Sequence, residues 1–216
     1  KTKARFFSIL NHDLRSPVAN LIAFLQIKKQ NPGLLDEEVK LQMENKTLTA
    51  AENLLVSMED ILFWSKSQME NFQPQPEKVD LDLVFSDLAK HFSDVGNINL
   101  VFENLEDIVI FTDENYLKTI LRNLTANAVK ALVNTQNPKI IFKAWHDNGT
   151  DFISVTDNGP GVKEEQFRAL YDEKEVVGIQ SGLGLHLIRD LAKVIDCKIS
   201  VESIPASGTT FTLSFQ

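Results

Sequence analysis

Apolar side chains recur at helical spacing through the first 72 residues. One set repeats every seven residues, the spacing of a coiled-coil seam, and comprises Leu41, Leu48, Leu55, Leu62 and Met69. An earlier set has similar spacing and comprises Phe7, Leu10, Leu14, Val18, Leu21, Phe24 and Leu25. Between the two sets, Asn31-Pro32-Gly33 breaks a helix, and Asp36 is a suitable N-cap for the next helix. The pattern predicts an α-helical hairpin over residues 1–72.

The apolar seam of this hairpin needs a partner. A single hairpin cannot bury an apolar seam on both flanks, whereas two copies can do so in a four-helix bundle. We therefore predict a homodimer through residues 1–72. The alternative is a monomer in which the seam packs on its own second domain. Pro17 lies inside the first predicted helix, where it removes a backbone hydrogen bond and predicts a kink.

The pattern changes near residue 72. The stretch "NFQPQPEKVDL" combines two prolines with polar neighbours, so we predict two domains, residues 1–72 and 73–216. We expect strands at 98–104 and 107–113, a helix at 113–134 with Asp113 as its N-cap, a β-hairpin at 139–159 turning at Asn148-Gly149, a helix at 184–196 and a closing hairpin at 198–215. Hairpins with helices between them predict an α/β sandwich and not a doubly wound parallel sheet.

Composition and charge narrow the range of partners. Residues 1–72 contain nine basic and nine acidic side chains, so the net charge of −8 is carried by the second domain. An acidic surface argues against binding a phosphate backbone, and we expect no nucleic acid partner. No apolar run reaches the roughly 18 residues needed to cross a bilayer, so we expect no membrane contact by this fragment. The single Cys197 suits a reducing compartment and a small core position.

Three stretches of the second domain carry residues suited to chemistry. "NLTANAVK" sets Asn123, Asn127 and Lys130 on one helical face, where carboxamide oxygens can ligate a hard cation and the ammonium can meet a phosphate. "DNGPG", residues 157–161, follows a predicted strand, so its glycines let the backbone approach a flat ligand. "SGLGL" opens a helix with Gly182 and Gly184, and free N–H groups at a helix start favour an anion.

One histidine of the first domain stands out. His12 lies among apolar residues in "FFSILNHDLRSPV", directly before Asp13. A histidine on a helix is most often an ordinary surface or core residue, and only the rest of the chain favours a nucleophile here.

Taken together and in this order, the motifs resemble those of sensor histidine kinases of two-component systems, over essentially the whole chain. "FFSILNHDLRSPV" is similar to the H box of that family, "NLTANAVK" to the N box, "DNGPG" to the G1 box, "SGLGL" to the G2 box and "SGTTF" at 207–211 to the last glycine motif. The resemblance implies a dimerisation and histidine-phosphotransfer domain at 1–72, followed at 73–216 by an ATP-binding sandwich of the gyrase type. The fold is thus expected to be a helical hairpin, dimerising as a four-helix bundle, and then this α/β sandwich.

The resemblance also implies roles for residues. His12 would accept the phosphoryl group of ATP and pass it to an aspartate of a response-regulator receiver domain, with Asp13 as base. Asp157 would bind the adenine amino group, Asn127 would ligate Mg²⁺ with support from Asn123, and Lys130 would face the phosphates. The remaining nucleotide-binding positions implied by the motifs are Gly159, Gly161, Gly182, Leu183, Gly184 and Thr209. Residues 161–181 would form a mobile lid. The resemblance implies that this chain is a cytoplasmic fragment of a longer sensor, and the start at Lys1 fits such a fragment.

The sequence departs from the family pattern at three positions. Ala131 stands where an aromatic residue is frequent, and Lys174 where the lid has its second aromatic residue after Tyr171. Ser16 replaces the usual Thr or Asn one turn after the histidine. In the family this side chain is thought to orient the water that removes phosphate from the partner's aspartate. The resemblance therefore also allows phosphatase activity toward the receiver domain. Three alternatives stay open: a non-catalytic dimeric interaction module, a gyrase-type conformational clamp, and a related kinase that phosphorylates serine.

Overall fold

The structure, a computed structural model, describes the second half of the chain almost completely. It describes residues 73–93, 95, 97–104, 106–163, 167–171 and 182–216, together with 18–19, 22–27, 29, 36, 38–45, 47–48, 51, 55 and 58 of the first half. The chain divides into two compact units, Lys1–Gln68 and Met69–Gln216. The functional roles that the sequence indicates for residues 1–72 and 73–216 stay predictions.

In the first unit, the described residues are helical except for Asp36. The backbone N–H of Lys40 donates to the carbonyl oxygen of Asp36 at 2.9 Å, which is the first helical hydrogen bond expected after an N-cap. Leu41, Leu48 and Leu55 of the predicted seam are each 59% exposed within one chain. His12, Asp13 and Ser16 lie outside the described residues, as does the predicted kink at Pro17. The dimeric bundle therefore stays a prediction.

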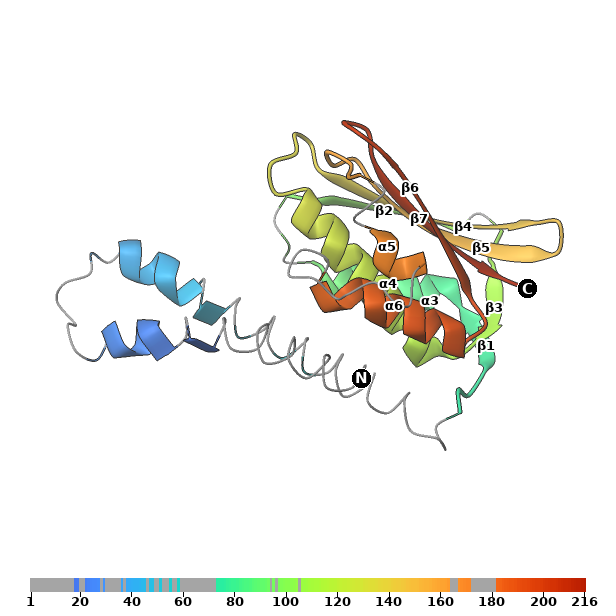
Figure 1. The fold of residues 1–216 in the computed structure, drawn as a ribbon, viewed down its shortest axis with the longest axis horizontal. Coiled ribbons are helices and arrows are strands. Elements are labelled where there is room, and N and C mark those ends of the chain that lie inside the picture. The colour runs from blue at the N-terminus through green and yellow to red at the C-terminus, as the bar shows by residue number, and fades with distance from the viewer. Residues whose placement is uncertain are drawn as a thin grey trace. The chain divides into compact units, whose positions relative to one another are not determined.

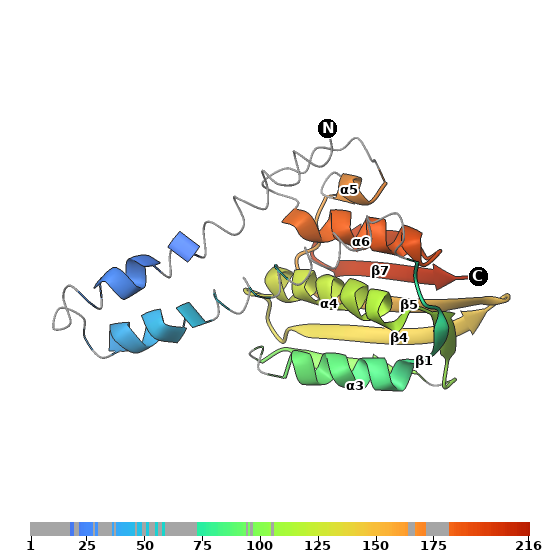
Figure 2. The same cartoon turned by 90° about the horizontal axis from the view of Figure 1, so that it is seen from below.

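The second unit mixes strands and helices. In chain order its elements are β1 (Glu77–Asp80), α3 (Leu81–His91), β2 (Asn99–Glu103), β3 (Val109–Thr112), α4 (Glu114–Ala131), β4 (Lys139–Asp147), β5 (Thr150–Asp157), α5 (Arg168–Tyr171), α6 (Gly182–Val194), β6 (Lys198–Ile204) and β7 (Gly208–Phe215). Five strands form one sheet in the order β2-β4-β5-β7-β6, and β1 pairs with β3 in a separate two-stranded sheet. Helices α3, α4 and α6 lie side by side on one face of the large sheet (Figures 1 and 2). The predicted α/β sandwich is confirmed.

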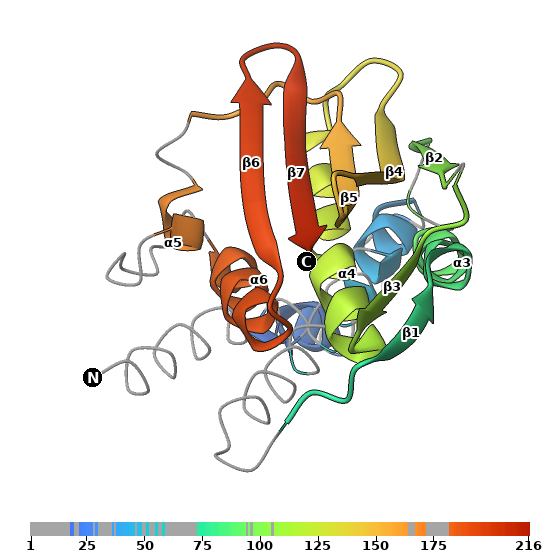
Figure 3. The same cartoon turned by 90° about the vertical axis from the view of Figure 1, so that its right-hand side faces the viewer.

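Alternating burial along the strands explains the two layers. On β4, Ile140, Phe142 and Ala144 are buried, while the residues between them are more exposed. Phe142 stacks on Phe102 of β2, with ring centroids 4.7 Å apart. Since alternate side chains of a strand point to opposite faces, the apolar set faces the helices and forms the core. Figure 3 shows the strands of the large sheet side by side, from β6 at the left to β2 at the right, with α6 and one end of α4 below them.

Several local predictions are confirmed. Strands β4 and β5 are joined at Asn148 (φ 50°) and Gly149 (φ 79°), a pair of positive φ values that suits a two-residue hairpin. Helix α4 begins after Asp113, whose Oδ1 accepts hydrogen bonds from the backbone N–H groups of Asn115 at 3.0 Å and Tyr116 at 3.2 Å. The other carboxylate oxygen of Asp113 accepts from the backbone N–H of Gln75 at 2.8 Å, so this side chain also holds the segment before β1.

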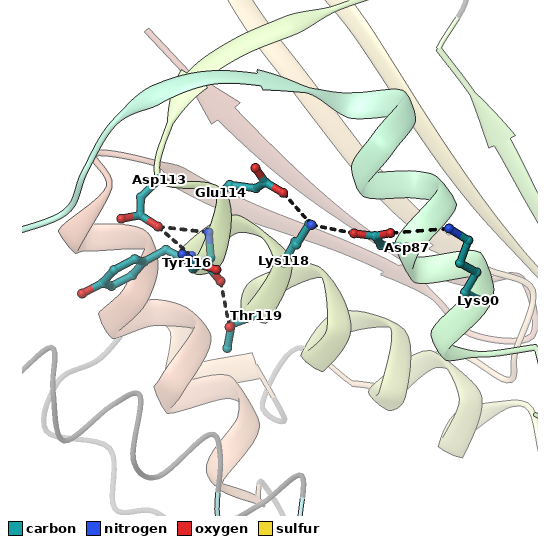
Figure 4. Close-up of polar contacts among 8 residues, drawn as sticks. Asp87, Lys90, Asp113, Glu114, Tyr116, Lys118 and Thr119 are labelled. Carbon is teal, nitrogen blue, oxygen red and sulfur yellow. Dashed lines mark hydrogen bonds and ion pairs between the residues drawn. The ribbon is translucent and has the colours of Figure 1, made fainter.

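Helix α3 and strand β1 were not foreseen from the sequence. An ion-pair cluster ties α3 to α4, and Figure 4 shows Lys118 of α4 between Glu114 of the same helix and Asp87 of α3. The Lys118 Nζ lies 2.6 Å from Asp87 Oδ2, and this hydrogen bond lowers the pKa of the Asp87 carboxyl.

Strand β2 pairs with β4 in parallel, which is the one parallel pairing among the described strands of the large sheet. Among the described residues, none of the helices combines the length and the apolar character that crossing a membrane requires.

Candidate functional site

A cavity of about 310 Å³ opens between α4, α6 and the inner face of the sheet. Its lining residues are Asn127, Ala128, Lys130, Ala131, Asp157, Val162, Phe167, Leu185, Thr209 and Phe211. Four of these, namely Asn127, Lys130, Asp157 and Thr209, are residues that the motifs indicated for nucleotide binding. A carboxylate, a carboxamide, an ammonium and a hydroxyl group therefore meet at one cavity, although they come from segments up to 82 positions apart.

The buried carboxylate of this cavity is Asp157, the last residue of β5. Its side chain is 5% exposed, and its Oδ1 accepts a hydrogen bond from the backbone N–H of Gly159 at 2.8 Å. Burial raises the pKa of the Asp157 carboxyl, while backbone hydrogen bonds from Gly159 and Thr209 act against this rise. Both donors favour the ionised form of Asp157, whereas burial favours its neutral form and has the larger effect, so the pKa of this carboxyl is raised.

Close backbone approach explains two glycines next to Asp157. A Cβ on Gly208, whose φ is +112°, would lie 1.9 Å from the carbonyl oxygen of Asp157. A Cβ on Gly161, whose φ is +64°, would lie 2.3 Å from the carbonyl oxygen of Ile204. Neither contact is possible for a real side chain, so both positions require glycine for the strand ends to pack together. Gly161 was among the predicted residues, and Gly208 was not.

The side-chain amides of Asn123 and Asn127 on α4 lie close to the start of α6. Asn123 Nδ2 donates to the carbonyl oxygen of Thr119 at 3.0 Å, which holds this side chain against its own helix. A Cβ on Gly184 would lie 3.4 Å from Asn123 Oδ1 and 3.8 Å from both amide heteroatoms of Asn127. These are ordinary van der Waals distances, so the first turn of α6 lies close to the two carboxamides. Gly182 and Leu183 are the first two residues of that helix.

Six lining residues were missed by the sequence reasoning, and all of them are apolar. Phe167 and Phe211 form an edge-to-face pair with ring centroids 5.5 Å apart and an interplanar angle of 89°. Phe211 lies within the last glycine motif, which is the one signal that could have marked it. The others, Ala128, Ala131, Val162 and Leu185, lie within or next to the quoted motifs but look like ordinary core positions. A mostly apolar wall with a few converging polar groups is typical of small-molecule sites.

The predicted residues that the structure does not bring to this cavity fall into two groups. Those of the second unit do not line the cavity but lie in the same segments as its lining residues, and they are Asn123, Gly159, Gly161, Gly182, Leu183 and Gly184. His12, Asp13 and Ser16 belong to the first unit and lie outside the described residues. Their relation to the cavity therefore stays a prediction.

The fold and cavity define the class of the second unit. Residues 112–216 match the family described as "Histidine kinase-, DNA gyrase B-, and HSP90-like ATPase". This stretch contains the N, G1 and G2 motifs and the last glycine motif, and it is similar to the ATPase domains of that family.

Relatives extend the similarity to the whole chain. The chain is 27% identical to the sensor protein EvgS of Escherichia coli K12, over 98% of this chain and 18% of EvgS. It is also 27% identical to the autoinducer 2 sensor kinase/phosphatase LuxQ of Vibrio parahaemolyticus, over 99% of this chain and 26% of LuxQ. These comparisons confirm the resemblance to sensor histidine kinases that the motifs indicated. The chain spans about a quarter or less of the length of these two relatives.

A solved structure agrees in fold. The histidine kinase ThkA, in complex with the response regulator protein TrrA, superposes with a TM-score of 0.70 at 22% identity. The match covers 97% of this chain and 60% of the ThkA chain. At this level of identity the likeness concerns the fold.

Proposed function

We propose that this chain binds ATP at the cavity of the second unit, transfers the γ-phosphoryl group to His12, and passes it to an aspartate of a response-regulator receiver domain. The observation that carries the proposal is the meeting of Asp157, Asn127, Lys130 and Thr209 at one cavity. The ATPase family match over residues 112–216 and the two sensor relatives, which match 98% and 99% of this chain, support it.

The base-binding end of the proposed site is the end at Asp157. Its carboxylate accepts a hydrogen bond from the adenine amino group, a donor that a guanine ring does not have at that position. Phe167, Phe211 and Leu185 supply the apolar surface on which a flat ring loses its water. Gly159, which holds Asp157 Oδ1, keeps this acceptor pointed in one direction.

The phosphate-binding end lies toward α4 and the start of α6. The Lys130 ammonium meets the phosphates as a point charge, and the first N–H groups of α6, from Gly182 through Gly184, favour an anion. The carboxamide oxygens of Asn127, with Asn123 beside it, fit a hard cation such as Mg²⁺, because both amides lie at the contact with Gly184. When bound, Mg²⁺ would reduce the negative charge of the phosphates.

The residues proposed for the phosphoryl transfer step, His12 and Asp13, belong to the first unit. The unprotonated ring nitrogen of His12 attacks the γ-phosphorus, a P–N bond forms, and the bond to the oxygen bridging the β- and γ-phosphates breaks to release ADP. Asp13 takes up the proton of the other ring nitrogen and so keeps the attacking nitrogen nucleophilic. A covalent histidine intermediate divides transfer from ATP to an aspartate into two easier steps. The protein contributes mainly positioning and charge neutralisation.

The proposed partner is a receiver domain. ThkA is seen with a response regulator, and the present chain shares its fold over 97% of its length. LuxQ carries the name kinase/phosphatase, which supports a second activity of Ser16 toward the phosphorylated receiver. We also propose that the chain is a homodimer through residues 1–72, because Leu41, Leu48 and Leu55 are left exposed within one chain.

Incubation with γ-labelled ATP and Mg²⁺ tests the phosphorylation step. We expect a phosphoryl group on the protein that is labile in acid and stable in base, and no labelling of a His12→Gln variant. Chelation of Mg²⁺ should abolish the labelling of the wild-type protein. Undiminished labelling of His12→Gln would refute His12 as the acceptor.

A further inference from the structure

A hydroxyl group on the edge strand β6 lies at the centre of a small hydrogen-bond network beside the cavity. Ser203 Oγ accepts a hydrogen bond from the backbone N–H of Val162 at 2.8 Å. The same oxygen donates to the carbonyl oxygen of Gly208 at 3.3 Å and lies 3.0 Å from Thr209 Oγ1. Val162 and Thr209 both line the cavity, whereas Ser203 does not. Ser203 therefore links two residues that line the cavity, Val162 and Thr209, without lining the cavity itself.

The number of protons limits the directions that these hydrogen bonds can take together. A serine hydroxyl has one proton and two lone pairs. One lone pair of Ser203 receives the Val162 N–H, and the proton can go to the Gly208 carbonyl. Either hydroxyl could donate in the contact between Ser203 and Thr209, but with the Ser203 proton on Gly208 the donor is Thr209. Thr209 Oγ1 then has only lone pairs to offer to a ligand.

This direction matters because Thr209 is the cross-strand neighbour of Asp157. Thr209 on β7 pairs with Asp157 on β5 and, on its other side, with Ser203 on β6. The Oδ1 of Asp157 accepts a hydrogen bond from the backbone N–H of Gly159 at 2.8 Å, and an ionised carboxylate has only acceptors to offer. Two neighbouring acceptors match an exocyclic amino group, which carries two protons.

We propose that Ser203 is a positioning residue for base selectivity: its hydroxyl sets the rotamer and proton direction of Thr209, so that Thr209 and Asp157 together select a purine that carries an amino group. The inference rests on the proposed nucleotide-binding function and deepens it. Ser203 acts through Thr209 and does not touch the nucleotide itself.

Calorimetric titration with two nucleotides tests this role in the full chain. The probes are ADP and the diphosphate of purine riboside, which lacks the amino group, each with Mg²⁺. We expect Ser203→Ala to lower the ratio of the two affinities about 3- to 10-fold, the usual effect of one hydrogen bond. Ser203→Thr keeps the hydroxyl and should restore the ratio. Ser200→Ala, the same change on the same strand but with its side chain on the opposite face of the sheet, is the matched control and should leave the ratio unchanged.

The outcomes separate the two levels of the proposal. If the wild-type chain binds neither probe, the proposed nucleotide site is wrong. If the wild-type chain prefers ADP and Ser203→Ala weakens both probes equally, or changes neither, Ser203 has no role in selectivity and the inference is overturned. If Ser203→Ala does not fold, Ser203→Cys takes its place with the same outcomes, because a thiol is a poor hydrogen-bond partner of similar size.

Discussion

The backbone N–H of Gly159 donates to the carboxylate of Asp157 at 2.8 Å, two positions back along the chain. A Cβ placed on Gly159 would lie at the same distance of 2.8 Å from that oxygen, too close for a side chain. The turn after β5 is therefore tight enough for the chain itself to hold the acceptor. This local geometry explains the sequence "DNG", because the turn brings the Gly159 N–H within hydrogen-bonding distance of the Asp157 carboxylate.

The first prediction concerns Asp157. Asp157→Asn replaces half of the carboxylate by an amide donor, which faces the adenine amino group as a second donor. A hydrogen bond to a charged group contributes about 1.5–3 kcal/mol, so we expect ADP affinity to fall roughly 10- to 100-fold. Calorimetry with Mg²⁺-ADP gives the affinity. Wild-type affinity in Asp157→Asn would remove this residue from the proposed site.

Two glycines with positive φ, Gly149 and Gly208, test whether close backbone approach requires glycine at Gly208. A Cβ added to Gly149 (φ +79°) would meet no atom within 4 Å, so Gly149→Ala should cost only the left-handed backbone conformation, about 1–2 kcal/mol. Gly208, at φ +112°, lies farther from the left-handed helical region, so Gly208→Ala has a higher backbone cost, and its Cβ would also lie 1.9 Å from the Asp157 carbonyl oxygen. We expect the Gly208 variant to be clearly less stable in urea than the Gly149 variant. Equal midpoints for the two variants would contradict the close approach of β7 to β5.

The chemistry of the single cysteine provides a test of burial. Cys197 is 7% exposed, and burial raises the pKa of its thiol to about 12. The thiolate is the reactive form, and it becomes abundant only as the pH rises toward that raised pKa. At pH 8 the native protein should therefore react with a thiol reagent far more slowly than the protein unfolded in guanidinium. Equal rates in the two states would show that Cys197 is accessible.

A fourth prediction concerns the dimer. Burying a leucine side chain contributes about 1.5–3 kcal/mol, and Leu48 and Leu55 are both 59% exposed within one chain. Light scattering should report a dimer at micromolar concentration for the wild-type chain. Leu48→Lys together with Leu55→Lys should shift it toward the monomer, while Leu83→Lys, an exposed leucine of α3 in the other unit, serves as the control. A wild-type monomer would favour the alternative in which the seam packs on the second domain.

The last prediction concerns Ser16. Serine keeps a hydroxyl that can orient a water molecule, but it lacks the methyl group that restricts threonine to fewer rotamers. We expect Ser16→Thr to dephosphorylate a receiver faster than the wild-type chain, and Ser16→Ala more slowly, with little change in labelling by ATP. The decay of a phosphorylated receiver gives the three rates. If Ser16→Ala equals the wild type, Ser16 has no phosphatase role.

The sequence predicted those elements whose signals are local. The N-cap Asp113, the turn at Asn148-Gly149 and the helix around Leu187 and Leu191 each depend on a few neighbouring residues, and all three are found. Strand β1 has only four residues, Glu77–Asp80, and is too short for its alternation to be noticed. The parallel pairing of β2 with β4 joins residues about 40 positions apart, and no local pattern reports such a contact.

The candidate site shows the same limit. Asn127, Lys130, Asp157 and Thr209 were named because they belong to motifs, and they do line one cavity. Phe167 was not named, since an apolar residue that lines a ligand site looks in the sequence like any core residue. Ser203 was missed for a different reason. Its part in the site comes from cross-strand register, which places it beside Thr209 and depends on the sheet as a whole.

The parallel pairing of β2 with β4 has a consequence for the order in which the second unit folds. The hairpins β4–β5 and β6–β7 close through short turns, so they can form early from contacts between near neighbours in the chain. Strand β2 reaches β4 only after the intervening β3 and α4 have been placed, which requires a long loop to close first. The helix that carries Asn123, Asn127 and Lys130 lies within that loop. The pairing of β5 with β7, which sets Asp157 opposite Thr209, spans a longer segment still. Both long-range pairings, and with them the cavity, are therefore expected to form after the two hairpins.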